Sequence, residues 1–111
     1  MAKIGTLDFT GISGHVYTFN VYPYNYQLPE KEAVYFVTHR TIKADSSVDH
    51  ILVFVGDTEN LANEFKKHSK QNCFDKEVVN CICVHWEDHA NTRAKIKDDL
   101  LNHYHPPCND F

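Results

Sequence analysis

The segment at residues 33–56 decides the fold, and it reads AVYFVTHRTIKADSSVDHILVFVG. Nearly continuous apolar runs occupy its two ends, at 33–39 and 50–56, and both are rich in β-branched and aromatic residues. Such runs are typical of strands that are buried on both faces. The polar residues 41–49 between them have the composition of a loop. We therefore expect two buried strands joined by this loop.

A hairpin is expected before this segment. Residues 6–10 are predicted to form a first strand, and the following glycines and serine supply a turn. Residues 15–22 then alternate as a strand with two different faces does. Pro23 ends the strand because proline has no N–H to donate, and 24–32 is a loop. One face carries Val16, Thr18, Asn20 and Tyr22, and the other carries Tyr17, Phe19 and Val21.

Helices and a strand alternate after residue 56. A helix is expected to start at once, capped by Asp57 or Thr58, and to stop near residues 70–72. A strand follows at 78–86, and a last helix runs from about residue 88 to 104. The strand has Cys81, Cys83 and His85 on one face and Ile82, Val84 and Trp86 on the other; the apolar contacts of the last helix are Ala90, Ala94, Ile96, Leu100 and Leu101. The expected class is α+β: a small β-β-α-β-α sheet flanked by helices and preceded by the hairpin, in one domain over 1–111.

The composition is that of an ordinary globular domain. The chain has 111 residues, of which 42% are hydrophobic and 13% aromatic, and this suffices for one core. The formal net charge of -4 lacks the basic footprint typical of domains that bind nucleic acid. A local group of lysines, Lys66, Lys67 and Lys70, is interpreted as the solvated face of a helix.

The cellular compartment follows from what the chain lacks. It shows no secretory signal and no apolar stretch of the roughly 18 residues that a membrane span needs. We therefore expect a cytoplasmic protein without a membrane partner. Thiols stay reduced in that compartment, so Cys73, Cys81, Cys83 and Cys108 are expected to be free thiols.

Four short motifs follow one another along residues 33–109. They are Ala33-Val34-Tyr35; Phe54-Val55-Gly56; the segment 61–68, which reads LANEFKKH; and a last group of Arg93, Ile96-Lys97, Leu100-Leu101 and Pro106-Pro107-Cys108-Asn109. Their order and spacing resemble those of the GIY-YIG nuclease family. That family has a Gly-Ile-Tyr strand, a Tyr-Ile-Gly strand end, a helix with Arg and His, and a later helix with Arg, an Ile-Glu pair, a proline and an Asn. The hairpin at 6–22 lies outside this GIY-YIG-like core.

The resemblance implies a metal-dependent phosphodiesterase site in which several groups are replaced. In the family a tyrosine helps to activate water, a glutamate holds one divalent ion and an arginine stabilises the phosphate. Tyr35, His68 and Asn109 match the family, whereas Phe54 stands for a tyrosine, Glu64 for the arginine and Lys97 for the metal-binding glutamate.

These replacements predict that no competent catalytic set remains. An ammonium cannot ligate a divalent ion and repels one, and a carboxylate at position 64 would repel a phosphate. Asp98 and Asp99 adjoin Lys97, but each step along a helix turns about 100°, so neither points where Lys97 points. We expect no cofactor and no bound metal. Mg²⁺ or Mn²⁺ would be required only if the chain were an active nuclease with an altered site.

The changes at Glu64 and Lys97 are reciprocal in charge. If the fold brings both positions to one cleft, the two side chains are expected to pair with each other. Otherwise both are exposed charges on helix faces. Both readings stay open.

The cysteines and histidines suggest further chemistry with less specificity. Cys81, Cys83 and His85, with Cys73 or Cys108 nearby, invite a zinc reading. However, alternate strand residues lie about 6.5–7 Å apart, and structural zinc sites use ligand pairs on tight turns. Buried core cysteines are favoured instead. A catalytic cysteine is not favoured, because nothing in the sequence marks an oxyanion-binding turn.

Four histidines lie late in the sequence: His85, His89, His103 and His105. They are interpreted as surface residues rather than as a pH sensor.

An aromatic run in the hairpin has two readings. Tyr17, Phe19, Tyr22, Tyr24 and Tyr26 could stack on the bases of single-stranded nucleic acid. Alternating aromatics are also what a half-buried hairpin needs, and the acidic chain favours this second reading.

Three classes of function remain. The favoured one is a non-catalytic module that binds a protein of unknown identity or a second copy of itself. A nucleic-acid-binding remnant would use Tyr35, His68, Asn109 and the three lysines, against the acidic charge. The alternative to both is a divalent-metal-dependent DNA endonuclease with an altered site.

Overall fold

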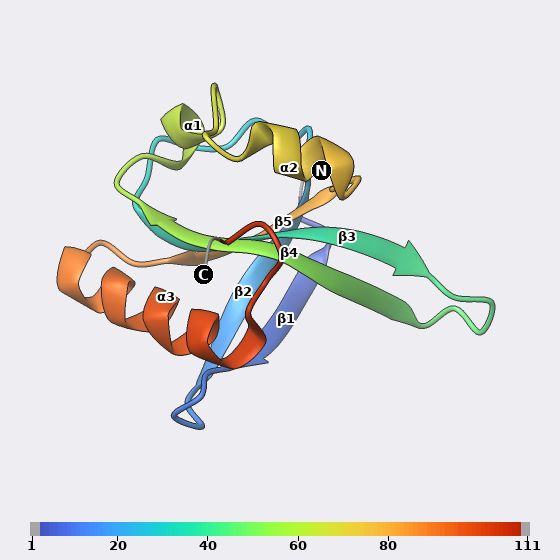
Figure 1. Ribbon diagram of the computed structural model, residues 1–111, viewed down its shortest axis with the longest axis horizontal. Helices are drawn as coiled ribbons and strands as arrows, with labels where there is room; N and C mark the ends of the chain where they lie inside the picture. Colours follow the sequence, from blue (N-terminus) through green and yellow to red (C-terminus); the bar gives the residue numbers. More distant parts are fainter. Residues whose placement is uncertain (1–2, 110–111) are drawn as a thin grey trace.

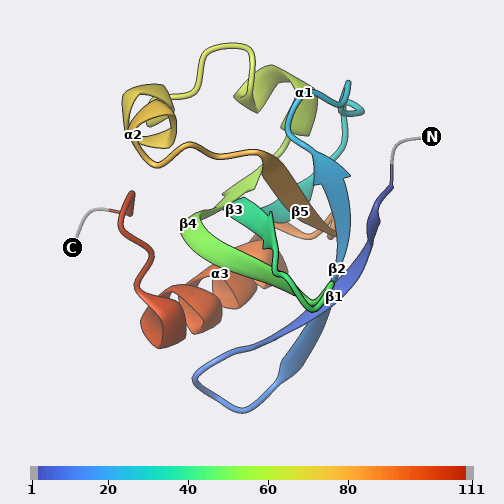
Figure 2. The same ribbon diagram turned by 90° about the vertical axis from the view of Figure 1, so that its right-hand side faces the viewer.

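The computed structural model describes residues 3–109 and shows an α+β fold built on one curled antiparallel sheet (Figures 1 and 2). The five strands lie in the order β1-β2-β5-β3-β4. The elements are β1 (Gly5–Thr10), β2 (Val16–Pro23), β3 (Ala33–Ile42), β4 (Val48–Thr58), α1 (Leu61–Glu64), α2 (Gln71–Lys76), β5 (Cys81–Trp86) and α3 (Ala90–Tyr104).

Strand β3 is an interior strand of the sheet and is buried on both faces, as its apolar sequence predicted. Residues 33–38 are all buried, and β4 and β5 pair with them on either side. Because side chains alternate along a strand, Val34 and Phe36 point to the face that α3 covers. Tyr35 and Val37 point to the opposite face, which α1 and α2 cover (Figure 1). The sheet is therefore sandwiched between two helical layers.

Each face of the sheet has its own buried cluster. The cluster beneath α3 contains Phe9, Phe19, Val21, Val34, Phe36, Val55, Cys81, Cys83, Ile96 and Leu100. The cluster beneath α1 and α2 contains Leu28, Ala33, Tyr35, Val37, Val53, Leu61, Phe74, Ile82, Val84 and Cys108. The predicted alternation of both hairpin strand β2 and strand β5 is confirmed by this division.

The N-terminal hairpin belongs to the same sheet, because β2 pairs antiparallel with β5. Its turn rests on α3 through Asp99, which accepts hydrogen bonds from the Ser13 N–H (2.9 Å), the Ser13 hydroxyl (2.7 Å) and the Tyr17 hydroxyl (2.7 Å). Gly11 lies so close to the Asp99 carboxylate that any Cβ there would collide with it. The turn and α3 therefore fit together only with glycine at this position.

The prediction of a single helix directly after residue 56 is wrong. Strand β4 continues through Asp57 and Thr58, so neither residue caps a helix. Helix α1 has one turn, and it is capped by Asn60, whose Oδ1 accepts the Asn63 N–H at 3.0 Å. A second short helix, α2, begins only at residue 71. Between α1 and α2, His68 Nδ1 accepts a hydrogen bond from the Lys70 N–H at 3.0 Å. In a continuous helix this N–H would donate to a backbone carbonyl of the same helix instead.

The boundaries of the last strand and helix also differ from the prediction. Val78 has a left-handed backbone (φ 56°) where α2 ends, so the strand predicted from residue 78 begins at Cys81. Helix α3 buries Arg93, Ile96 and Leu100, a stripe at helical spacing. The alanines of α3 that were expected to make apolar contacts, at positions 90 and 94, are exposed.

The expectation of four free thiols is corrected by a disulfide between Cys73 and Cys108. It joins α2 to the segment that follows α3, two parts of the chain 35 residues apart that the fold brings together. Cys81 and Cys83 are free and buried. A zinc site that combines either of them with Cys73 or Cys108 is not available while the disulfide is formed.

None of the described helices is long and apolar enough to cross a membrane.

Candidate functional site

A cleft of about 190 Å³ lies beside the edge strand β4, and it gathers most of the residues that the family resemblance singled out. Its lining comes from β3, β4, α1, α3 and the chain after α3: Tyr35, Phe54, Val55, Gly56, Asp57, Glu64, Lys97, Leu101 and Asn109. His68 does not line the cleft, but its ring contacts Tyr35. All six candidate positions therefore meet in one place.

Tyr35 is the hub of this cleft. Its side chain is fully buried, and its hydroxyl lies 2.8 Å from Glu64 Oε2 and 2.7 Å from His68 Nε2. His68 Nδ1 accepts the Lys70 N–H, so the proton of the neutral ring must be on Nε2. His68 Nε2 therefore donates to the Tyr35 hydroxyl, and the hydroxyl donates to the Glu64 carboxylate. The three side chains form a directed chain of hydrogen bonds that ends on a negative charge.

The protonation of this chain follows from burial and from Glu64. Burial, followed by the charge and hydrogen bond of Glu64, raises the pKa of Tyr35 far above its ordinary value. Burial is also the main reason that the pKa of His68 lies below its ordinary value, against an opposing effect of Glu64. At neutral pH the tyrosine hydroxyl keeps its proton and the imidazole stays neutral. Tyr35 is therefore poorly suited to take a proton from water.

Gly56 and Phe54 shape the floor of the cleft. Gly56 is paired with Tyr35 across the β3–β4 ladder. A Cβ at Gly56 would lie 2.7 Å from the Phe54 ring and 2.8 Å from the Tyr35 hydroxyl oxygen, so only glycine leaves room for both rings. The Phe54 ring packs edge-on against His68, with centroids 5.2 Å apart. The ring at position 54 thus supports the hydrogen-bond chain without adding a second hydroxyl.

Asp57 is the residue of the cleft that the sequence analysis missed as a site residue. Its carboxylate lies 3.6 Å from Lys97 Nζ and 3.9 Å from Arg93 Nε. Arg93 is buried, and its Nη1 donates to the Glu87 carbonyl at 3.2 Å. Its Nε has no hydrogen-bond partner among the described residues. The position of Asp57 directly after Gly56 was the available signal, but it was assigned to a helix cap.

The expected pair between Glu64 and Lys97 does not form among the described residues. Both side chains line the same cleft and are about one-third exposed. Lys97 pairs with Asp57, however, and Glu64 lies 3.6 Å from His68 Nε2. The alternative of two exposed charges on helix faces describes them only in part, because both side chains are partly buried and each has a partner in the cleft. Asp99 faces the hairpin turn and does not point where Lys97 points, as the helical geometry predicted for the latter.

The chain after α3 forms one wall of the cleft by pairing with the outer edge of β4. The Cys108 N–H donates to the Val53 carbonyl at 2.9 Å. The Asn109 side-chain amide accepts the Val55 N–H and donates to the Val55 carbonyl, both at 2.9 Å. This segment satisfies backbone groups that an edge strand would otherwise leave open. We call residues 105–109 the tail.

A second and larger groove of about 560 Å³ lies between the loop at 24–30 and the α1–α2 segment. Lys66 is part of its lining, together with Tyr24 and Tyr26. The aromatic run of the hairpin does not make one stacking platform. Tyr17 and Phe19 belong to the α3 face, whereas Tyr22 and Tyr24 belong to the opposite face.

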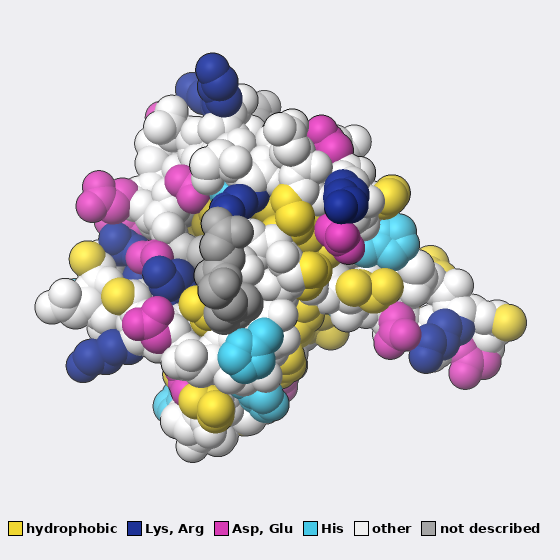
Figure 3. All heavy atoms as spheres, in the orientation of Figure 1, with side chains coloured by type: hydrophobic (Ala, Val, Ile, Leu, Met, Phe, Trp, Pro, Cys, Tyr) yellow, Lys and Arg dark blue, Asp and Glu magenta, His cyan; other side chains and the backbone are white. Residues whose placement is uncertain are grey.

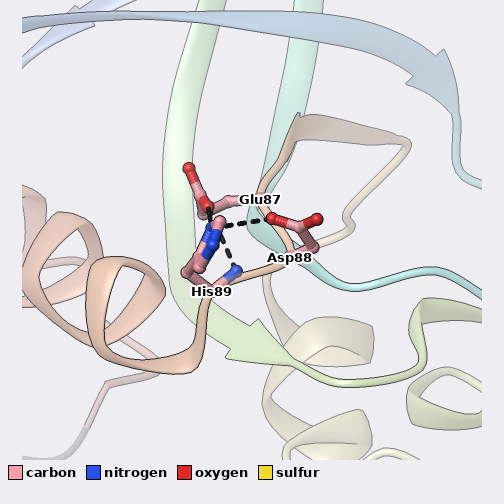
Figure 4. A group of neighbouring side chains, drawn as sticks. All are labelled: Glu87, Asp88 and His89. Atoms are coloured by element: carbon pink, nitrogen blue, oxygen red, sulfur yellow. Dashed lines mark hydrogen bonds and ion pairs between the residues drawn. The ribbon is translucent and has the colours of Figure 1, made fainter.

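Three of the late histidines, His85, His89 and His103, have partners close to them in space. The rings of His85 and His103 hydrogen-bond through Nδ1 to the backbone carbonyls of Thr18 and Thr10, which ties them to the hairpin. His89 lies between two carboxylates at the start of α3 (Figure 4).

The residues Glu87, Asp88 and His89 have side chains of the kinds that ligate metals, and they lie close together. His89 Nδ1 lies 2.8 Å from Asp88 Oδ1 and 3.1 Å from Glu87 Oε2. The hydrogen bond to Glu87 and the charge of Asp88 raise the pKa of His89, which favours the protonated ring over a metal-binding one.

The visible surface carries charges of both signs. In Figure 3 the lysine and arginine side chains are interspersed with aspartates and glutamates over this face, and no continuous basic patch is seen there.

Neither a scan against protein-family models nor searches of curated proteins and of solved structures finds a match to this chain.

Proposed function

We propose that this protein is a catalytically inactive domain with a GIY-YIG-like core over residues 33–109, and that it works by binding rather than by cleavage. The observation that carries the proposal is the hydrogen bond from the Tyr35 hydroxyl to the Glu64 carboxylate, 2.8 Å long, in a cleft that also holds Lys97. Phosphodiester cleavage, which the family resemblance implies, needs an arginine at position 64 and a metal-binding carboxylate at position 97.

The electrostatics of the cleft support this proposal. A phosphodiesterase needs positive charge at the phosphate and a ligand for a divalent ion. Here Glu64 places a negative charge beside the tyrosine and raises its pKa. Lys97 is held 3.6 Å from Asp57 and places an ammonium where the ion would bind. The charge of the side chain at each of these two positions is thus opposite to the charge that the reaction needs.

A protein partner or a second copy is the binding target that the surface favours. The net charge of -4 opposes nucleic acid. The β3–β4 hairpin extends away from the rest of the molecule (Figure 1) and carries Ile42, Val48 and Ile51, of which Ile42 is 64% and Ile51 56% exposed. Ile42 and Val48 are paired across the hairpin and lie on one face of it, whereas Ile51 pairs with His39 and lies on the other. The projection therefore exposes aliphatic side chains on both faces, and exposed apolar surface of this kind is a candidate for protein contacts.

The second candidate, an active nuclease with a relocated metal site, has one observation in its favour. Asp57 and Glu64 are two carboxylates that line the same cleft, and Mg²⁺ or Mn²⁺ prefers oxygen ligands. Lys97 opposes it, because its ammonium already neutralises Asp57.

A cleavage assay decides between the two candidates. Plasmid and oligonucleotide DNA would be incubated with Mg²⁺ or Mn²⁺ and with the wild type, Tyr35→Phe, or the double variant Glu64→Arg with Lys97→Glu. We expect the wild type to be inert. Divalent-dependent cleavage by the wild type that Tyr35→Phe abolishes would overturn the proposal. Cleavage gained only by the double variant would support it, since the two reversals would then be what blocks the reaction.

Sedimentation velocity tests the binding target. If the hairpin projection mediates self-association, the wild type sediments as more than a monomer and Ile51→Asp sediments as a monomer. The control is Val78→Asp, which changes another exposed aliphatic residue (64% exposed) outside the hairpin. A monomeric wild type would direct the search to a different protein.

A further inference from the structure

The Cys73–Cys108 disulfide lies between the tail and the rest of the fold. Cys108 is buried, whereas Cys73 in α2 is only partly buried. The tail that carries Cys108 also carries Asn109, which forms a wall of the Tyr35 cleft. One covalent bond therefore links the wall of the cleft to α2.

Besides the disulfide, the described tail contacts β4 through a small set of hydrogen bonds. Two of its five residues are prolines, which have no N–H to donate. Among the described residues, the hydrogen bonds that join it to β4 include the one from the Cys108 N–H and the two made by the Asn109 amide. The tail leaves α3 through His105, whose backbone is left-handed (φ 47°), a region that residues other than glycine occupy less often. Pro106 and Cys108 are buried, and the disulfide is the covalent link between the tail and α2.

We propose that the Cys73–Cys108 disulfide is a redox-controlled latch: a dithiol reductant opens it, the tail leaves β4, and the Tyr35 cleft loses its Asn109 wall. This inference does not depend on what the cleft binds.

The chemistry of opening is thiol–disulfide exchange. A thiolate of the reductant attacks Cys73 Sγ, the more accessible sulfur, and Cys108 leaves as a thiolate and takes up a proton. The second thiol of the reductant then attacks the mixed disulfide and releases Cys73 as a thiol. Two electrons and two protons pass to the protein, and the reductant becomes a disulfide.

Hydrogen exchange of the Val55 amide gives a direct readout, because that N–H donates to Asn109 Oδ1 in the tail. Exchange would be followed residue by residue by NMR on the full chain, oxidised and after treatment with dithiothreitol. Thiol titration of the denatured protein would confirm two thiols before reduction and four after it. We expect the Val55 amide to exchange at least tenfold faster after reduction, while amides of β2, β3 and β5 keep their rates.

Two variants make the test specific. Asn109→Ala keeps the disulfide but removes the acceptor, so its Val55 amide should exchange fast in both redox states. Cys73→Ser replaces the partly exposed cysteine and should behave as the reduced wild type without any reductant. Unchanged exchange at Val55 after complete reduction would overturn the latch, and so would an equal acceleration at every amide, because that would show global destabilisation instead of local release.

Discussion

Removing one oxygen atom from the centre of the cleft is the sharpest test of the hydrogen-bond chain. Tyr35→Phe keeps the buried ring and its packing but deletes the hydroxyl that joins His68 Nε2 to Glu64 Oε2. The structure assigns a direction to each bond, so the consequences for the two partners differ. The buried N–H of His68 loses its acceptor, and the neighbouring Glu64 Oε2, at 3.6 Å, is beyond hydrogen-bond distance. Glu64 is about one-third exposed and can turn to water.

The magnitude follows from these two consequences. A buried donor that loses its acceptor costs about 1–3 kcal/mol, and the bond to the partly hydrated carboxylate adds little. We expect Tyr35→Phe to lower the free energy of unfolding by about 2 kcal/mol. The unfolding entropy of globular proteins is about 2.1 cal/mol/K per residue near 60 °C, which gives about 0.23 kcal/mol/K for 111 residues. The melting temperature should therefore fall by about 9 °C.

Urea unfolding and differential scanning calorimetry measure the two quantities independently. Tyr26→Phe is the matched control, because it removes the same hydroxyl from a tyrosine that is 36% exposed; its cost should stay below about 0.5 kcal/mol. A Tyr35→Phe variant as stable as the Tyr26→Phe control would show that the chain of hydrogen bonds contributes nothing, and the assigned donor directions would then have no support.

Three further predictions concern single positions. Gly56→Ala should cost about 1–3 kcal/mol in urea unfolding because its methyl group overlaps two rings, whereas Gly5→Ala, with no atom within 4 Å of its Cβ, should be neutral. Asp99→Asn should cost about 1–2 kcal/mol and raise proteolytic cleavage in the hairpin turn, since that carboxylate accepts three hydrogen bonds from the turn region; the adjacent exposed Asp98→Asn should leave both measurements unchanged. The folded-state pKa of His68 is lower than its ordinary value of 6.5, so the unfolded chain takes up the proton first as the pH falls. Stability is then complete above pH 6.5 and declines as the pH falls from there toward the folded pKa, and His68→Gln should show a smaller loss between pH 7.5 and 5 than the wild type.

The strands could be predicted from sequence because their signal is local. The apolar runs around Tyr35 and Phe54 and the alternation around Phe19 and Cys83 each fall within a few residues, and the structure places all of them in strands with the expected faces. The order of those strands is not local. That β5 lies between β2 and β3 depends on pairing between segments some 60 residues apart, such as Val21 with Cys83.

The prediction of one helix after β4 failed because a side chain, and not a backbone carbonyl, accepts a backbone hydrogen bond there. The His68 ring bonds to the Lys70 N–H, and no periodicity reports such a bond. The disulfide was missed because a cytoplasmic compartment was expected to keep the thiols reduced. The predicted helix stopped near residues 70–72, and nothing local suggested that Cys73 would lie within bonding distance of Cys108.

The sequence predicted which residues lie in the cleft better than it predicted which of them contact each other. The motif resemblance named Tyr35, Glu64 and Lys97, and the structure brings all three to one cleft. It also suggested that the last two would pair, whereas Asp57 pairs with Lys97. Pairing depends on side-chain positions to within an ångström or two, which spacing along the chain does not determine.

The place of β5 between β2 and β3 has a consequence for how the chain folds during synthesis. The two hairpins, β1–β2 and β3–β4, are each complete well before β5 emerges, and in the described sheet β5 is the strand that joins them. At about 5–20 residues per second, a ribosome takes roughly 1–5 s to go from the end of β4 at Thr58, where both hairpins are complete, to the start of β5 at Cys81. An isolated hairpin is marginally stable in water, so during those seconds the nascent chain presents two unpaired apolar edges. Folding of this protein should therefore depend on chaperone protection until the last third of the chain has been made.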